Sequence, residues 1–296
     1  MKAKVTRKKG KGRRQSKRKS SKGTFWGGVG RILFWAILLA VAIVVVVFFY
    51  ECNPGEMTEG QSLELPEGAE IPQWREVSRE GEEEIIHRTG YVLSYNSGYR
   101  LANWVAWALT ATEALSKEVE RNDFFRADPD VTGKSAQVSD YKNSGYDRGH
   151  LAPAGDMKWS EQAMKESFYL SNICPQISDL NRGIWKTMEE ECRQWAVDYG
   201  EILIVAGPVV EEGSLRIGKN EIIVPQRFYK VICRLSDNKY HGIAFLLENR
   251  AYEAADWKSL AISIDSVEKV TGIDFFPLLP DREEEVMESV VEVSVW

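Results

Sequence analysis

The 296-residue sequence predicts an α+β domain with a mixed or antiparallel central sheet flanked by helices, preceded by one N-terminal transmembrane helix. Short segments of alternating apolar residues, bounded by Gly, Asn and Pro, recur through the C-terminal two thirds and are typical of strands. Longer segments between them place apolar residues at helical spacing. The 44% apolar content is sufficient for a packed core, and residues 32–50 form one apolar run of bilayer length.

The N-terminal segment predicts a membrane anchor. Residues 1–31 contain thirteen Lys or Arg and no Asp or Glu, so we expect a disordered, cytoplasmic tail. Residues 32–50 are nineteen uncharged, mostly apolar residues, about 28 Å of helix. Positive charge before this run and acidic residues after it place the C-terminal domain on the periplasmic or extracellular side. No Ala-x-Ala site follows the run, which favours an uncleaved anchor over a signal peptide.

The composition of residues 51–80, rich in Pro, Gly and Glu, predicts a linker, and residues 81–296 form the expected folded domain. Two short strands are predicted from residue 84 onward, around a turn at residues 96–98. Residues 101–121 carry Leu, Trp, Val and Ala at helical spacing, which predicts an amphipathic helix that faces the core.

The second half of the domain is predicted to consist mainly of strands. Asp265 with Glu268 reads as a capping box that opens a short helix, and Gly272 is expected to end it. The acidic tail from residue 282 onward is expected to be peripheral. Strands are predicted at residues 201–210, where a Gly-Pro break ends the strand, and at residues 221–224, 228–235 and 240–247.

The four cysteines, at positions 52, 174, 192 and 233, form no CxxC pair and show no zinc-ligand spacing with histidine. The interpretation we favour is that they are small buried apolar residues. A disulfide among Cys174, Cys192 and Cys233 stays open for a domain outside the cytoplasm.

Two stretches carry the candidate chemistry. The first is DRGH at residues 147–150, which follows the turn-forming Asn-Ser-Gly of residues 143–145 and contains one of only three histidines. A histidine beside an arginine and a glycine suits a general base next to a phosphate clamp. The second contains YLSNICPQ at residues 169–176 and LNRGIW at residues 180–185, followed by Glu189. Together, in this order, the motifs resemble the DNA/RNA non-specific endonucleases, which are ββα-metal nucleases, over residues 81–281.

The resemblance implies a role for each matched residue. His150 is the general base that takes a proton from the attacking water, and Asn181 is the single protein ligand of Mg²⁺, with Mn²⁺ able to substitute. Glu189 orients metal-bound water, on a helix expected to be continuous from Asn181. Asn172 holds the site and its phosphate. The supporting residues are Asp147 and Arg148, which form local salt bridges, and Gly149, which allows a tight backbone turn.

The resemblance also places an arginine at the scissile phosphate. Arg121 has the family spacing, and Arg126 in the same stretch is the alternative. The implied reaction is hydrolysis within DNA and RNA strands with little sequence preference. Outside the basic tail the charge balance is −19, so positive charge must be concentrated in a groove.

Three alternatives remain open at this stage. One is a catalytically weak or inactive membrane-anchored protein of the same fold that binds nucleic acid or serves the envelope. Another is a tether that binds nucleic acid through the basic tail. A homodimer, which occurs among relatives, is also left open.

Overall fold

The computed structural model describes residues 64–75, 83–252 and 256–296. The chain divides into the units Met1–Gln61 and Ser62–Trp296, and the whole of the first unit lies outside the described residues. The predicted cytoplasmic tail, the predicted transmembrane helix and Cys52 all fall there. Of the helices that are described, none is both long enough and apolar enough to traverse a bilayer.

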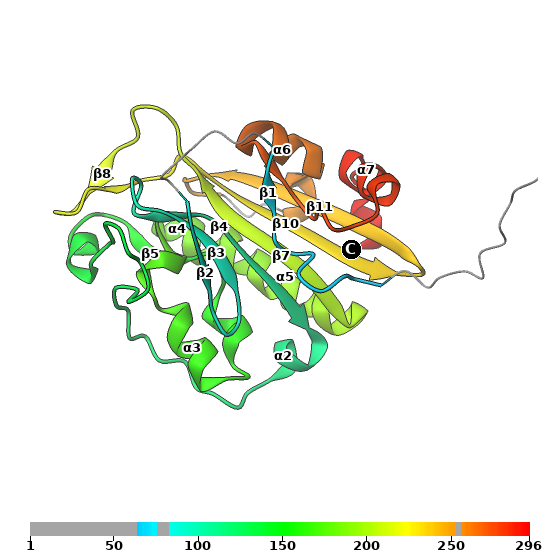
Figure 1. The fold of residues 1–296 in the computed structure, drawn as a ribbon, viewed down its shortest axis with the longest axis horizontal. Helices are drawn as coiled ribbons and strands as arrows, with labels where there is room; N and C mark the ends of the chain where they lie inside the picture. The colour runs from blue at the N-terminus through cyan, green and yellow to red at the C-terminus, as the bar shows by residue number, and fades with distance from the viewer. Residues whose placement is uncertain (1–63, 76–82, 253–255) are drawn as a thin grey trace, which may run out of the picture. The chain divides into compact units, whose positions relative to one another are not determined.

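A seven-stranded sheet organises the folded unit, with strand order β12-β11-β10-β7-β4-β3-β2 (Figure 1). Every neighbouring pair in it is antiparallel, which confirms the antiparallel form of the predicted sheet. The strands are β2 (Glu84–His87), β3 (Val92–Asn96), β4 (Leu101–Thr110), β7 (Glu201–Val209), β10 (Arg227–Ser236), β11 (Lys239–Glu248) and β12 (Ala261–Ile262).

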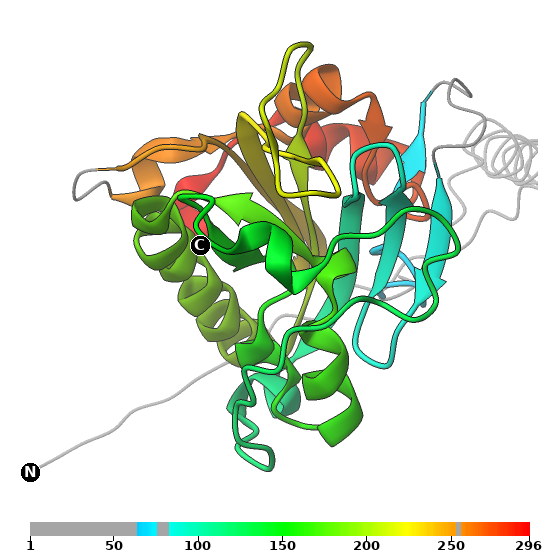
Figure 2. The same ribbon diagram turned by 90° about the vertical axis from the view of Figure 1, so that its left-hand side faces the viewer.

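Both faces of this sheet are covered. Helix α5 (Ile184–Tyr199) packs on one face, and α6 (Ile264–Thr271) and α7 (Asp281–Ser289) lie on the other (Figures 1 and 2). Alternate residues of the central strands therefore enter two separate apolar cores. In β7, Ile202 and Ile204 belong to the core under α5, whereas Leu203 and Val205 belong to the core under α6 and α7.

The predicted helix over residues 101–121 is wrong. Residues 101–110 form the ten-residue strand β4, and only the short helix α2 (Ala111–Leu115) follows, with Thr110 and Glu113 as its capping box. Strand β4 lies between β3 and β7 and is buried on both faces, so both of its faces are apolar. Such a run cannot be distinguished from a buried helix by periodicity.

A ββα unit lies beside the main sheet and contains the DRGH segment. Strand β5 (Asp147–His150) pairs antiparallel with β6 (Ile173–Gln176), and α4 (Ser178–Arg182) and α5 follow. The predicted turn at residues 96–98 is confirmed between β3 and β4, but the single strand predicted before it is two strands, β2 and β3, and the strand after it occupies residues predicted to be helical. The remaining elements are η1 (Val138–Tyr141), η2 (Ala154–Met157), α3 (Glu161–Ser167), η3 (Leu170–Asn172), η4 (Trp257–Leu260), η5 (Val293–Val295), and the paired strands β1 (Gln73–Trp74) with β13 (Ile273–Asp274) and β8 (Arg216–Ile217) with β9 (Ile222–Ile223).

The predicted C-terminal strands are found as β7, β9, β10 and β11, with one correction. Gly207 and Pro208 lie inside β7 and do not end it. Pro208 is paired with Phe228 of β10, and on the side of β4 the pairing of β7 ends at Ala206, so the missing N–H of Pro208 costs no hydrogen bond to β4.

Two further expectations at the C-terminus need correction. Helix α6 is capped by Ser263, not by Asp265, although Gly272 ends it in the left-handed region with φ 71° as predicted. The tail is not peripheral, because α7 packs on β11 and the ring of Trp296 lies 4.8 Å from that of Trp195.

Cys174, Cys192 and Cys233 are buried and free, so no disulfide forms among them. This confirms the favoured interpretation that they are small apolar core residues. Burial raises the pKa of the Cys192 thiol to about 12, which keeps it protonated and unreactive at neutral pH.

Candidate active-site cavity

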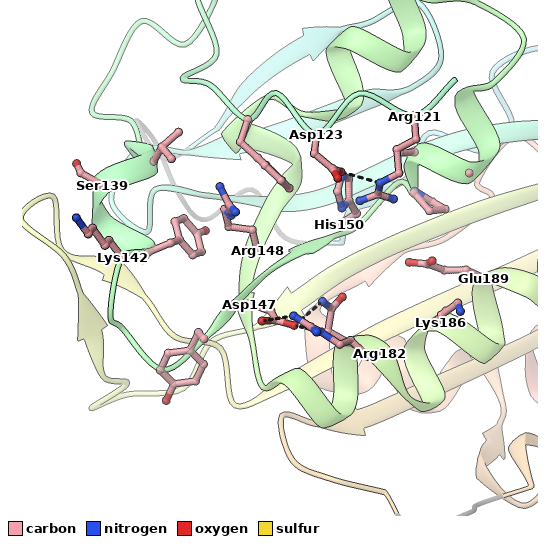
Figure 3. A pocket seen from close by; sticks show the side chains of 18 of the residues that line it. Arg121, Asp123, Ser139, Lys142, Asp147, Arg148, His150, Arg182, Lys186 and Glu189 are labelled. Carbon is pink, nitrogen blue, oxygen red and sulfur yellow. Dashed lines mark hydrogen bonds and ion pairs between the residues drawn. The ribbon is translucent and has the colours of Figure 1, made fainter. Parts of the chain in front are cut away.

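A cavity of about 820 Å³ opens over the ββα unit (Figure 3). Its walls come from the loop at residues 121–125, from β5 and η2, and from α4 and α5. The side chains of Arg121, His150 and Glu189 point toward the same space, and Asn181 also lines it. Residues separated by up to 68 positions in the sequence therefore meet at one place.

Strand pairing positions the histidine. His150 pairs with Ile173 at the end of β5, and Gly149 pairs with Cys174. The expected role of Gly149 in a tight turn is wrong, because it lies within the strand. A side chain is excluded there for a different reason: an added Cβ would lie 2.0 Å from Oε1 of Gln176. The turn before the strand is made by Asn143 and by Gly145, with φ of 58° and 87°.

The imidazole of His150 is held in an aromatic environment. It is 7% exposed, with its ring 5.0 Å from that of Phe168 and 5.5 Å from that of Phe125. Its backbone oxygen accepts a hydrogen bond of 3.0 Å from the indole of Trp185, a core residue as predicted. The Nε2 atom is buried and has no hydrogen-bond partner among the described residues.

Burial, reinforced by the positive charge of Arg121, lowers the pKa of His150 to about 3. The ring is therefore neutral at physiological pH. A neutral imidazole whose Nε2 makes no internal hydrogen bond can exchange a proton with a molecule bound in the cavity.

Asp147 orients the beginning of the helical segment. Its Oδ2 accepts hydrogen bonds from Nε of Arg182 at 2.8 Å and from Nδ2 of Asn181 at 3.2 Å. Burial alone would raise the pKa of Asp147, but these donors outweigh it and lower the pKa below its usual value. Because Nδ2 of Asn181 is turned toward Asp147, its amide oxygen is the atom left to face the cavity.

The salt bridge predicted for Asp147 is thus present, whereas Arg148 behaves differently. No ion pair of Arg148 is found among the described residues, and its guanidinium lies 4.1 Å above the ring of Phe125. That position leaves an exposed positive charge at the mouth of the cavity.

The expected continuous helix from Asn181 to Glu189 is broken. Gly183 separates α4 from α5 with φ −97° and ψ −117°, and an added Cβ would lie 2.3 Å from the carbonyl oxygen of Asp179. Both Asn181 and Glu189 nevertheless line the cavity. Of the three consecutive glutamates, only Glu189 does so, and Glu190 pairs with Lys186 at the surface.

Glu189 is half-buried, and its side chain extends from α5 toward the cavity. Burial raises its pKa to about 7, and the charge of Lys230 opposes that rise most strongly. Glu189 therefore sits near the midpoint of its titration at neutral pH, which suits a group that positions or exchanges protons of bound water.

The two candidate arginines are distinguished by their packing. Arg121 lines the cavity, pairs with Asp123 at 2.7 Å and lies 5.3 Å from the ring of Phe168. Arg126 does not line it. Its guanidinium lies over the rings of Phe124 and Tyr169 and donates to the carbonyl oxygen of Lys165 at 3.0 Å.

Asn172 is fully buried and lies outside the cavity lining. Its Oδ1 accepts from the N–H of Ala152 at 2.9 Å, and its Nδ2 donates to the carbonyl oxygens of Ala152 and Ser167. Asn172 therefore fixes the segment that follows His150, which agrees with the expectation that it helps to hold the site. The structure gives no support for the expected contact of Asn172 with a phosphate, because both ends of its carboxamide already form internal hydrogen bonds.

Sequence reasoning missed a charged group beneath the cavity. Lys230 of β10 is 1% exposed, and its ammonium lies 4.5 Å and 5.2 Å from the rings of Trp185 and Trp107. Nearby, the carboxylate of Asp156 accepts a hydrogen bond of 2.8 Å from the guanidinium of Arg193, which also lines the cavity. The available signal was a lysine in a strand that is otherwise apolar at its centre. Three further basic residues of the lining were also missed: Lys142, Arg182 and Lys186.

The donors in the cavity suit a hard cation that keeps most of its water. Among the described residues, no group of three His, Cys, Asp or Glu side chains converges here as a metal cluster would require. Asn181 and Glu189 both line the cavity and offer it an amide oxygen and a carboxylate from two successive helices. Mg²⁺ binds oxygen ligands, dehydrates reluctantly and is commonly held by one or two protein groups, so these residues fit it.

Comparison with known proteins gives a consistent result. Residues 75–282 match the family model for DNA/RNA non-specific endonucleases. The chain is 36% identical over 210 residues to the mitochondrial nuclease EXOG of Danio rerio, covering 66% of this chain but only 61% of that protein. It is 35% identical to nuclease C1 of Cunninghamella echinulata var. echinulata, covering 66% of this chain and 84% of that protein. A crystal structure of an EndoG/EndoGI complex superimposes with a TM-score of 0.64 and 30% identity, over 70% of this chain and 91% of that chain.

Proposed function

The chain belongs to the DNA/RNA non-specific endonuclease family, a family of phosphodiester hydrolases, and we propose that it cuts DNA and RNA internally with little sequence preference. The observation that carries this proposal is the convergence of His150, Asn181, Glu189 and Arg121 on one cavity. Hydrolysis of a phosphodiester needs an activated water, neutralisation of the charge on the phosphate and stabilisation of the departing oxygen. The four side chains match those needs.

Each residue has a proposed role that follows from its environment. His150 is the general base: its ring is neutral at pH 7 and accepts a proton from the attacking water. Arg121 faces the same space and offsets negative charge on the phosphate. Asn181 would hold Mg²⁺ through its amide oxygen, and Glu189 would orient water near it. When bound, the ion supplies Lewis-acid stabilisation of the phosphate and the leaving oxygen.

The low sequence preference follows from what surrounds these residues. The exposed charges of Arg148, Arg182 and Lys186 line the cavity and suit contacts with the phosphate backbone. Contacts of this kind fix the position of a strand without reading its bases. They also make binding strongly dependent on salt.

A plasmid-nicking assay with the full-length chain tests the proposal. Nicking is expected with Mg²⁺, and excess chelator should abolish it. The variant Asn181→Ala should lose activity and need more Mg²⁺ to reach its maximum rate, because its only change is at the ion's proposed ligand. If the parent binds DNA in a gel-shift assay but never nicks it under any of these conditions, the protein is a binding protein on a nuclease fold.

The proposed site of action is outside the cytoplasm, with residues 32–50 as the membrane anchor. The support is the charge asymmetry around that apolar run. Protease added to intact cells should digest the nuclease domain, whereas digestion only after lysis would place the domain inside. Light scattering of the purified full chain tests whether it forms a homodimer.

A further inference from the structure

A cluster of carboxylates joins the two helices on the face of the sheet opposite α5. Asp265 and Glu268 of α6 and Glu288 of α7 each bring a carboxylate oxygen within 4.8 Å of the other two. We call these three residues the α6–α7 carboxylate cluster. Two of them are almost completely buried, with Glu268 at 1% and Glu288 at 4% exposure, so the cluster is part of the interior.

The cluster contains an unsatisfied oxygen. Oε1 of Glu288 is buried and has no hydrogen-bond partner among the described residues, and the same holds for Oε1 of Glu284, one turn earlier on α7. The nearby guanidinium of Arg75 is already bound to Glu268 and, at 3.0 Å, to Asp274. A carboxylate buried without a partner is costly, so a native structure that keeps one calls for an occupant.

We propose that the α6–α7 carboxylate cluster binds one Ca²⁺ ion, which ties α7 to α6. The donors are all carboxylate oxygens, the kind that hard divalent cations prefer. All three donor oxygens lie within 4.8 Å of one another, so a single ion can contact them all. Ca²⁺ accepts irregular arrangements of oxygen ligands, whereas Mg²⁺ requires near-ideal octahedral geometry, so carboxylates fixed on two different helices suit Ca²⁺ better. The partly exposed Asp265 gives the ion a side from which to enter.

This ion would be structural and separate from catalysis. The three carboxylates lie on α6 and α7, and no residue of those helices lines the candidate active-site cavity. The competing occupant is a proton: burial, with the charges of Glu268 and Glu284, raises the pKa of Glu288 to about 9. A proton would satisfy Glu288 without any metal, and experiment distinguishes the two.

Thermal unfolding of the full-length chain in detergent, with CaCl₂ or with chelator, is the test. Calcium at about 100 times its Kd should raise the Tm by about 5 to 10 °C. The Glu288→Gln variant should lose this shift and, without calcium, melt at or above the parent. The matched control Glu285→Gln removes an exposed carboxylate from the same helix and should keep the shift. Asn181→Ala should also keep it. If Glu288→Gln does not fold, Asp265→Asn takes its place.

Calorimetric titration of the Asn181→Ala protein with CaCl₂ should show one site, absent from the double variant with Glu288→Gln. The proposal is overturned if the parent shows no calcium shift, or if Glu288→Gln keeps the full shift. It is also overturned if Asn181→Ala abolishes the shift, since the ion would then act at the active-site cavity. An equal shift with the same concentration of MgCl₂ would refute the assignment to calcium.

Discussion

The two faces of the central sheet carry opposite charge. On the α5 face, Arg121, Arg148 and Arg182 surround one cavity, whereas on the other face the buried Glu288 and the half-buried Glu284 lie close to other carboxylates. Seven antiparallel strands separate the two sets. The −19 balance outside the basic tail therefore does not oppose phosphate binding, because the position of a charge decides whether it acts on the substrate.

The faces also differ in how buried charges are compensated. Under the cavity, Asp156 is paired with Arg193, and Lys230 lies between two indole rings. Across the sheet, Glu288 has an oxygen without a partner. On the first face two indole rings stabilise the charge of Lys230, whose ammonium also has no hydrogen-bond partner among the described residues. On the second face the charged neighbours of Glu288 include other carboxylates, and we propose Ca²⁺ as the group that compensates them. Substitutions on one face should therefore change catalysis, and those on the other should change only stability.

The largest expected effect is that of His150→Ala. Loss of the general base should lower kcat by about 10² to 10⁴. The control His241→Ala removes a histidine of β11, which contributes nothing to the cavity lining, and should keep the parental rate. Initial rates of plasmid nicking at saturating Mg²⁺ measure both, with circular dichroism to verify folding. A parental rate for His150→Ala would refute its role.

The next largest effect is expected from replacing Arg121, and Arg126, five residues further on, provides the comparison. Arg121→Ala should lower kcat/KM on the order of 10²-fold, because a positive charge facing the phosphate is removed. Arg126→Ala should stay near the parental rate, since its guanidinium is engaged with Phe124, Tyr169 and Lys165 outside the cavity. Steady-state kinetics on a short duplex would reverse our assignment if Arg126→Ala were the more damaging change.

The comparison of faces also shows what a sequence can predict. His150, Asn181 and Glu189 could be predicted to lie near one another because each belongs to a short segment whose spacing is set by local structure, β5 in one case and α4 with α5 in the others, and all three line one cavity. Glu189 lines the cavity even though the helix is interrupted at Gly183, because Glu189 lies on α5, which begins directly after that glycine.

The features that could not be predicted from the sequence depend on contacts between residues distant in the sequence. Strand β4 looked helical because burial on two faces removes the alternation that marks a strand. Arg121 and Arg126 differ in the aromatic rings they contact, at position 168 for the first and at positions 124 and 169 for the second, and no spacing rule reveals those contacts. The surroundings of Lys230 could not be predicted because Trp107 and Trp185, whose rings its ammonium contacts, come from other elements.

A smaller effect concerns stability in acid. His150 has a pKa of about 3 in the folded state, against about 6.5 when unfolded. Below pH 6.5 the unfolded chain therefore binds a proton that the folded chain rejects, and stability falls as the pH falls toward 3. Between pH 7.5 and pH 5 the parent should lose about 2 kcal/mol more unfolding free energy than His150→Ala. Urea titrations with chelator at both pH values measure this, and equal losses would contradict it.

The smallest expected change is that of Lys230→Met. Among nearby charges, Lys230 contributes most to lowering the pKa of Glu189, which burial holds at about 7. Its removal should raise that pKa further, so less of Glu189 is ionised at pH 7 and the acid limb of the kcat/KM profile moves to higher pH. We expect a loss of less than about tenfold at pH 7 that is recovered near pH 9.

Lys258→Met is the matched control, since Lys258 also lies over an indole, 5.5 Å from that of Trp257, but is exposed and outside the cavity. It should leave the pH profile unchanged. A purely structural Lys230 would lower activity equally at every pH, or lower the Tm without moving the profile. Only a displaced acid limb with a parental rate at high pH supports an electrostatic connection from the core of the sheet to the cavity above it.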